Sequence, residues 1–323
     1  MQVFDKKIVY NFMKLRFASI GLSFILVLGS IVLLLTKGLN YGIDFSGGTL
    51  AQVKYNNNAP IEEIRNALDV NELFKGASVT EFGDKTEVVI RFAAISDTLS
   101  NDIADVLKQT LSKTGEFEIR RVDIVGPKVG GELRQKGLMA VLVSFALILL
   151  YIAIRFEWRF AMAAIISEIH DIVIVMGAIS LFSIDVNLDT LAAVLTVLGY
   201  SLNDTIIIFD RIRENIKSSK SIKMHDIINE SVSSTLSRTT LTSGTTLFTV
   251  LILYYFGGEI IHGFSLALIV GVIAGTLSSI FVASPLLMWF NFSVENYRNK
   301  ELSKQKAREE KEKMRLLYEK GQV

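Results

Sequence analysis

Six apolar runs, each about as long as a membrane-spanning helix, dominate this sequence of 323 residues. A helix needs roughly 20 apolar residues to cross the hydrocarbon core of a bilayer. The runs lie at about 17–36, 135–154, 160–182, 188–209, 240–257 and 264–290. Hydrophobic residues make up 50% of the chain and charged residues 21%, as is typical of integral membrane proteins. The sequence therefore predicts a polytopic α-helical membrane protein with six transmembrane helices.

Lysine and arginine are unevenly distributed among the segments between these runs. They occur at the N-terminus, between the second and third runs, and after the fourth run, at Lys6, Lys7, Lys14, Arg16, Arg155, Arg159, Arg211, Arg213, Lys217, Lys220 and Lys223. The segments 183–187 and 257–263 contain neither residue. Because basic residues collect in the cytoplasmic loops of membrane proteins, we expect both termini to be cytoplasmic.

This topology divides the chain into four parts. Residues 1–36 are expected to hold a cytoplasmic N-terminus and the first transmembrane helix, and residues 37–132 an external domain. Residues 133–290 then hold transmembrane helices two to six, and residues 291–323 a charged cytoplasmic tail. The tail interleaves lysine and arginine with glutamate, which favours a solvated or surface helix over one that binds anionic lipid or ribosomal RNA.

The external segment alternates the patterns of strands and helices. Strand patterns occur at 49–55, 77–82, 86–92 and 117–125, and helix patterns occur at 60–68 and 97–113. Gly83 and Asp84 between two of the strands are a hairpin signal. The second helix places Leu99, Ile103, Val106, Leu107 and Leu111 on one face. The order β-α-β-β-α-β predicts an α+β, ferredoxin-like domain. Such a domain could bind a polypeptide, contact a partner or brace the transmembrane helices.

Ionisable residues inside the apolar runs are the main functional signal, because a charge within a membrane costs several kcal/mol. The third run contains Glu168, His170 and Asp171, and the fourth contains Asn203 and Asp204. Thr196, Tyr200, Asn203 and Asp204 have spacings that predict one shared helix face. His170 and Asp171 are adjacent, so their side chains should point about 100° apart and face different partners.

Asp204 is the strongest candidate for a proton carrier. Its carboxylate lies inside the apolar run, where desolvation favours the protonated form and a nearby cation favours the charged form. Arg238, at the start of the fifth run, is the cation that could move toward or away from it. A static buried ion pair between the two remains an alternative, and Arg238 could also be a plain cytoplasmic anchor. Asn203, Asp171 and His170 are further candidates for the proton pathway, and helix packing explains His170 and Asp171 equally well.

Glycines flank the external segment on both sides. "YGIDFSGGT" (41–49) contains Gly42, Gly47 and Gly48, and "VGPKVGGEL" (125–133) contains Gly130 and Gly131. The first stretch is not a phosphate-binding loop, because it has neither GxGxxG nor GxxxxGK spacing and a strand follows it. One aspartate, Asp44, is too few ligands for a calcium loop. We therefore expect two hinges between the domain and the membrane helices, although a rigid corner would use glycine too.

Several kinds of chemistry have no support in this sequence. The chain has no cysteine and only three well-separated histidines, so we expect no thiol chemistry and no metal site. The sequence contains no Walker-type loop, so nucleotide hydrolysis has no support. Asp171 and Asp204 could form the aspartyl pair of an intramembrane protease, but neither lies in a GxGD motif. We expect no cofactor and no enzymatic activity.

The ordered motifs resemble one known family. "YGIDFSGGT", "VGPKVGGEL", "RFEWRFA" (155–161), the His-Asp pair, "GYSLNDTIIIFDRIREN" (199–215) and "TLSRTTLTSGTTL" (235–247) occur in the order seen in the SecF branch of the SecD/SecF family, within the RND superfamily. The resemblance covers the chain up to its tail. Matched residue by residue, it implies that Asp204 is the functional aspartate and Arg238 the functional arginine. Asn203 stands where the SecD motif has an acid.

The resemblance also implies a function and partners. SecF-like proteins work with SecD in the bacterial inner membrane, where the proton motive force helps polypeptides through the SecYEG channel. The expected partners are SecD, SecYEG, unfolded exported polypeptides and membrane lipids, with YajC and YidC as further family partners and no nucleic acid. Glu168, Asp185 and Asp189 depart from the family pattern and leave H⁺ and Na⁺ open as the coupling ion. Half of an RND-type exporter of small molecules or lipids is the alternative function.

Overall fold

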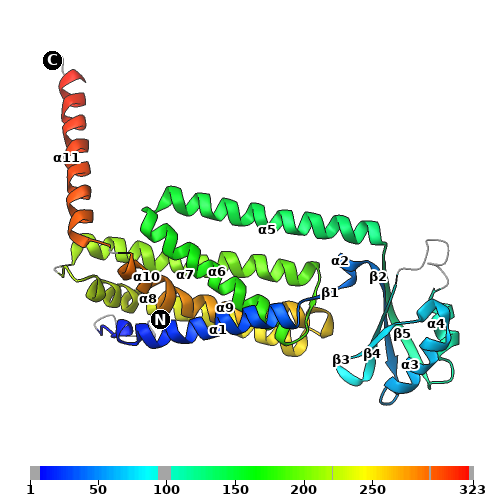
Figure 1. The fold of residues 1–323 in the computed structure, drawn as a ribbon. Helices are drawn as coiled ribbons and strands as arrows, with labels where there is room; N and C mark the ends of the chain where they lie inside the picture. Colours follow the sequence, from blue (N-terminus) through cyan, green and yellow to red (C-terminus); the bar gives the residue numbers. More distant parts are fainter. Residues whose placement is uncertain (1–7, 94–102, 220, 291, 320–323) are drawn as a thin grey trace.

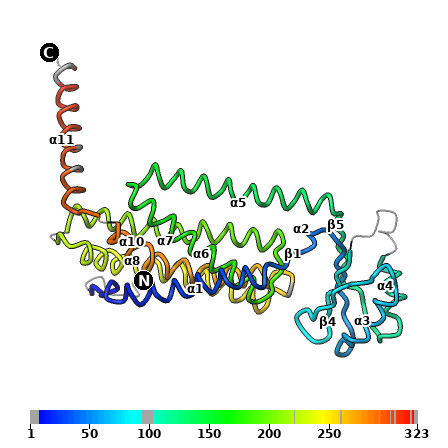
Figure 2. Tube along the Cα trace, in the orientation of Figure 1, coloured from blue at the N-terminus to red at the C-terminus, as the bar shows by residue number. Residues whose placement is uncertain are grey.

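The computed structural model describes residues 8–93, 103–219, 221–290 and 292–319 of the chain. A bundle of long helices forms one part, and a small α/β domain lies beyond one end of it (Figure 1). The long helices are α1 (Arg16–Thr36), α5 (Pro127–Arg155), α6 (Trp158–Leu181), α7 (Leu188–Ser218), α8 (Met224–Phe256) and α9 (His262–Ser278). A further helix, α11 (Val294–Glu319), projects from the end of the bundle opposite the domain (Figure 2).

Five helical segments among the described residues are long and apolar enough to cross a membrane. They are Phe12–Thr36, Pro127–Arg155, Trp158–Leu181, Leu188–Ser218 and His262–Trp289. The predicted fifth run, 240–257, is not one of them. It lies in the second half of the 33-residue helix α8, where a row of threonine and serine hydroxyls lowers the hydropathy. The structure thus has five candidate spans where the sequence predicted six.

The helices differ in how deeply they are packed. In the most apolar stretch of α6, α7 and of the segment containing α9, 44%, 50% and 56% of the residues are buried. The corresponding figures for α1 and α5 are 6% and 11%. α6, α7 and α9 therefore form the centre of the bundle, and α1 and α5 lie at its edges, with α5 running along one side (Figure 1).

Gly271 and Gly275, which form a GxxxG motif on α9, explain how closely α9 approaches α7. A Cβ atom on Gly275 would lie 2.7 Å from Cβ of Ser201, and one on Gly271 would overlap the side chain of Val197. Only glycine fits at these contacts, so the motif mediates a helix–helix interface. Beyond α9, a π-helical turn (Ser279–Ala283) leads into α10 (Ser284–Trp289). The turn stands directly before Pro285, which has no N–H to continue the regular pattern.

The α/β domain contains four strands and two helices. They are β2 (Gly48–Tyr55), α3 (Ile61–Val70), β3 (Ser78–Phe82), β4 (Asp84–Phe92), α4 (Ile103–Leu111) and β5 (Phe117–Val125), with a short 3₁₀ turn at Glu72–Phe74. The strands form one antiparallel sheet in the order β3-β4-β2-β5. Its core is apolar, with Val53, Ile64, Val88 and Leu107 fully buried. The predicted hairpin at Gly83 and Asp84 is present, and Gly83 has φ +77°. Leu99 and the other predicted helical residues before Ile103 lie outside the described residues.

The opening glycine stretch forms a compact joint between α1 and the domain. β1 (Asn40–Tyr41) pairs in parallel with β6 (Asp185–Val186), which lies between α6 and α7. A short helix, α2 (Ile43–Ser46), follows and packs against α5. Gly47 and Gly48 then turn the chain into β2 with φ of +70° and +132°, a region open chiefly to glycine.

The second glycine pair does not lie where the sequence suggested. Gly130 and Gly131 were expected in a loop before the second transmembrane helix, but α5 already begins at Pro127 and contains both. Proline is favoured at the first position of a helix, which explains the early start. A Cβ on Gly130 would lie 2.8 Å from the backbone nitrogen of Gly47. Gly130 therefore lets α5 touch the joint, and Gly131 has open space around it.

At the other end of the bundle, polar contacts join distant parts of the chain. Asn229 on α8 accepts a hydrogen bond from the backbone N–H of Met13 at 3.0 Å. Arg298 on α11 donates to the carbonyl oxygens of Ile216, Ser219 and Ser221, at the C-terminus of α7. A cation at a helix C-terminus satisfies otherwise unpaired carbonyls. The base of the charged tail is therefore fixed to α7.

Candidate functional site

A polar layer crosses the centre of the bundle between two apolar clusters. One cluster includes Phe160, Phe209 and Ile228, and the other includes Val175, Val197 and Ala267. Between them α6, α7, α8 and α9 contribute buried acids and hydroxyls. These polar residues, each at most 7% exposed, are Glu168, Asp171, Ser201, Asp204, Thr205, Ser243 and Ser278. Four helices therefore contribute buried polar groups to this part of the bundle.

Asp204 lies on α7 with only 1% of its surface exposed. Its Oδ2 accepts a hydrogen bond from the Ser243 hydroxyl on α8 at 3.1 Å, and Ser243 accepts one from Thr276 on α9 at 2.7 Å. Oδ1 has no hydrogen-bond partner among the described residues. A buried carboxylate with an unused acceptor gains by binding a proton, since the neutral acid needs less solvation.

Arg238 is near Asp204 but is not bonded to it. The two side chains interact electrostatically, yet the ion pairs of the described residues include none between them. The Arg238 side chain is exposed on α8. The static buried ion pair that the sequence left open is therefore absent from this conformation.

Asn203 does not share a face with Asp204, contrary to the predicted arrangement. Asn203 and Thr196 are exposed, and Asp204 is buried. Adjacent positions on a helix differ by about 100°, and the burial of Asp204 turns its neighbour outward. Tyr200 is half-buried and donates to the carbonyl oxygen of Thr242 at 2.8 Å. Asn203 is therefore available to a second protein that packs on this side of α7.

Asp171 forms a second polar centre on α6. Its Oδ2 accepts hydrogen bonds from Ser201 on α7 at 2.5 Å and from Ser278 on α9 at 2.7 Å. Its Oδ1 lies 2.8 Å from Nδ1 of His170. The two neighbours thus touch each other, but they face different helices, as expected: Asp171 faces α7 and α9, and His170 faces α1. No hydrogen bond between described residues joins Asp171 to Asp204, and each carboxylate has its own hydroxyl donors.

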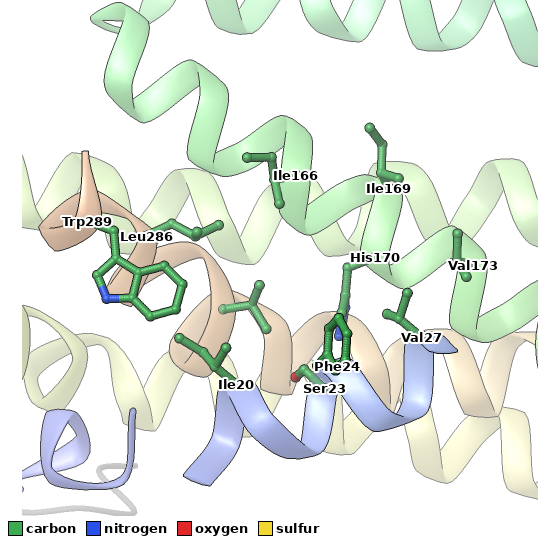
Figure 3. Close-up of a pocket in the computed structure, with 11 residues that line it drawn as sticks. Ile20, Ser23, Phe24, Val27, Ile166, Ile169, His170, Val173, Leu286 and Trp289 are labelled. Carbon is green, nitrogen blue, oxygen red and sulfur yellow. The ribbon is translucent and has the colours of Figure 1, made fainter. Parts of the chain in front are cut away.

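His170 lies between α6 and α1, beside the polar layer. Figure 3 shows its ring directed toward Phe24 and Ser23 of α1. It lines two apolar cavities of about 290 and 490 Å³ that run along α1. Nε2 has no partner among the described residues. His170 thus connects the polar layer to an apolar groove and does not reach Asp204 directly.

The joint is attached to the N-terminal end of the helix that carries Asp204. Asp44 in α2 accepts a hydrogen bond from the backbone N–H of Leu188 at 3.0 Å, at the start of α7. The N–H of Gly42 donates to the carbonyl oxygen of Val186 at 3.0 Å. From the domain itself, Arg91 on β4 forms an ion pair with Asp185. Asp185 is therefore a structural partner of the domain.

The sequence identified the acids of the site but not the hydroxyls that hold them. Ser201, Ser243, Thr276 and Ser278 were visible only as part of hydroxyl-rich helices. The spacing could have pointed to Ser201, because it precedes Asp204 by three positions and so lies one helical turn away. The partner helix of each hydroxyl, by contrast, follows from tertiary packing.

Comparisons with known proteins agree on one family. Residues 84–293 match the C-terminal region of the protein export membrane proteins SecD/SecF, and residues 32–59 match the SecD/SecF GG motif. The chain is 45% identical over 323 residues to protein translocase subunit SecF of Helicobacter pylori, covering 100% of both chains. It is 44% identical over 311 residues to SecF of Vibrio alginolyticus, covering 95% of this chain and 98% of the relative.

A solved structure has the same fold over most of the chain. It is a crystal structure of SecDF from Thermus thermophilus, described as a translocon-associated membrane protein. The two share 36% identity with a TM-score of 0.81, over 90% of this chain and 40% of that chain. The chain therefore spans less than half of the SecDF polypeptide that it resembles. It matches SecF relatives along their whole length, which favours a role in protein export over the export of small molecules.

Proposed function

This chain belongs to the SecD/SecF family as a SecF-type subunit of the Sec export machinery, and we propose that it uses the proton motive force to promote polypeptide translocation. It does so with SecD, through the SecYEG channel, and with YajC and YidC as further partners. The observation that carries the proposal is the buried Asp204, with an unused carboxylate oxygen, on the helix whose N-terminus holds the joint.

The energy of one proton is sufficient for such a role. A unit charge that moves through 100 mV releases about 2.3 kcal/mol. Since about 1.4 kcal/mol changes an equilibrium tenfold, one proton can bias two conformations by roughly fifty-fold. Arg238 assists by approaching the ionised carboxylate of Asp204 and withdrawing from the protonated one. The charge of Asp204 then decides how α7 packs on α8.

The joint provides the route from Asp204 to the external domain. Leu188 and Asp204 are sixteen positions apart on α7, about 24 Å at 1.5 Å per residue. A tilt or shift of α7 moves Leu188 and Val186, which are bonded to Asp44 and Gly42. The domain follows through Arg91 and Asp185. Gly42, Gly47, Gly48 and Gly130 are the positions at which this joint bends or holds.

The same proposal includes six membrane spans, with both termini on the cytoplasmic side of the inner membrane. The second half of α8 is the sixth span, and its contacts with α7 and α9 support this assignment. The external domain, 37–132, is a ferredoxin-like unit, as the sheet order β3-β4-β2-β5 supports. Because the chain has no cysteine, single cysteines report topology directly. Ile260→Cys should react with an impermeant thiol reagent from outside, and Ser218→Cys only from the cytoplasmic side.

The substitution Asp204→Asn tests the coupling step. It preserves the shape of the side chain and its bond to Ser243 but removes the exchangeable proton. We expect export that depends on the proton gradient to fall to the level of a strain without this subunit, with unchanged protein level and melting temperature. Asp189→Asn, an exposed acid on the same helix, is the matched control and should export normally. Normal export by the Asp204→Asn variant would refute the mechanism.

A further inference from the structure

Glu168 is a deeply buried ionisable side chain for which the proposed mechanism has no use. It lies on α6 with 1% of its surface exposed. Both carboxylate oxygens lack hydrogen-bond partners among the described residues. Because the burial comes from this chain's own helices, no partner subunit is needed to explain it. An ionised carboxylate in this state would carry a full desolvation penalty without compensation.

Asp171 stands one helical turn from Glu168 on the same helix. Residues three apart on a helix have Cβ atoms about 5–6 Å from each other. Asp171 and Ser201 are both close enough to Glu168 to interact with it. The single hydroxyl proton of Ser201, however, is already donated to Asp171 at 2.5 Å. Glu168 is therefore aimed at a neighbouring acid and at a donor that is already in use.

The charges around the pair do not compensate two negative acids. His170 contacts Asp171 and can balance one of them at most. Of the titratable groups on the packed helices, Asp204 lies on α7 and Arg238 on α8, and Arg238 interacts with Asp204. The membrane-embedded segments 17–36 of α1, 137–150 of α5 and 263–278 of α9 contain no titratable residue. Two like charges this close in a dry site cannot both be ionised.

We propose that Glu168 and Asp171 form a second proton-binding site, which holds one proton between the two carboxyl groups at neutral pH. The proton resides on Glu168, because Asp171 has three donors that stabilise its charged form and Glu168 has none among the residues that the structure describes. The protonated Glu168 gains an O–H donor of its own directed at Asp171. The site lies in the same layer as Asp204 but has its own hydroxyls, Ser201 and Ser278. It does not depend on the role proposed for Asp204.

Infrared spectroscopy of the full chain with its SecD partner in lipid vesicles tests the proposal. With ¹³C-labelled glutamate, a carboxylic acid band at neutral pH reports a protonated glutamate, because exposed glutamates are ionised there. We expect this band in the unmodified protein, its loss in Glu168→Gln, and its retention in Glu230→Gln, an exposed control on α8. It should also persist in Asp204→Asn, whatever that substitution does to export.

Two results would overturn the inference. One is the absence of the band from the unmodified protein at neutral pH, or its persistence in Glu168→Gln. The other is a band that appears only when Na⁺ is omitted, which would make the pair a sodium site. Loss of export in Asp204→Asn bears on the proposed function alone, so the two proposals fail independently.

Discussion

The two regions of α7 differ in how completely their polar groups are hydrogen-bonded: those at its N-terminal end have partners, and the acid in its middle has few. At the N-terminal end, Asn187 and Asp44 accept hydrogen bonds from backbone N–H groups, and Asp185 pairs with Arg91. In the middle, Asp204 keeps an oxygen without a partner among the described residues. Satisfied polar networks hold a fixed geometry, whereas a buried acid with few partners readily changes its protonation. One helix thus combines a firm attachment with a site at which charge can change.

At the joint beside the N-terminal end of α7, we expect the largest loss of stability from Gly47→Ala. Gly47 has φ +70°, and a Cβ there would lie 2.8 Å from Cα of Pro127. We expect this strain to cost on the order of 1–3 kcal/mol of stability, seen as a lower melting temperature of the purified protein. The control is Gly131→Ala, which has open space and should be neutral or slightly stabilising.

The same variant separates a hinge from a rigid corner. If Gly47 and Gly48 bend during export, translocation should fall by a larger factor than the melting temperature predicts. Parallel losses of export and stability would favour the rigid corner, and an unchanged melting temperature would contradict the packing described above.

A smaller effect is expected from breaking the ion pair between the domain and the bundle. Arg91→Ala leaves the half-buried Asp185 without its cation, which costs more than removing both charges. We expect faster proteolysis of the joint in Arg91→Ala than in the double variant Arg91→Ala/Asp185→Ala. Equal rates in the two variants would show that the pair contributes nothing to holding the domain.

The pH dependence of this contact has a defined sign. Burial raises the pKa of Asp185, and Arg91 opposes that shift only in part. An acid with a raised native pKa contributes stability that is present below the pKa of a free aspartate and is lost as pH rises through the native value. Protection of the joint from protease should therefore be greater in mildly acidic buffer than at neutral pH, and Asp185→Asn should remove the difference. Greater protection at neutral pH would contradict this.

The smallest effect concerns the cap of α7. Asn187 accepts a hydrogen bond from the N–H of Thr190 at 2.8 Å, and the hydroxyl oxygen of Thr190 accepts one from the N–H of Asn187 at 2.7 Å. Loss of such a cap costs about 1 kcal/mol. Asn187→Ala should lower the melting temperature modestly, and Asn187→Ser, which can still cap, should lower it less. An equal loss in both variants would mean that the side chain acts through packing instead.

Much of this architecture was contained in the sequence. Apolar length alone located the five candidate spans, because a bilayer imposes a single length on every helix that crosses it. Period-two patterns located the four strands of the domain, and Gly83 marked their hairpin. Asp204 stood out because a charge within an apolar run is costly wherever that run packs. Whether α8 crosses the membrane was harder to assign. Its serine and threonine hydroxyls lower the hydropathy, yet several of them donate to carbonyl oxygens of the same helix.

The tertiary structure decided which residues meet. Nothing in the spacing of Asp44 and Leu188, 144 positions apart, indicates that one caps the helix begun by the other. The sequence likewise could not show that Gly130 fits against Gly47, that Asp171 is held by α7 and α9, or that Glu168 has no donor. Local patterns are set by backbone geometry and solvent, which the sequence encodes residue by residue. Partners across helices depend on how whole surfaces pack, and the unpaired acids at the centre of the bundle are a product of that packing.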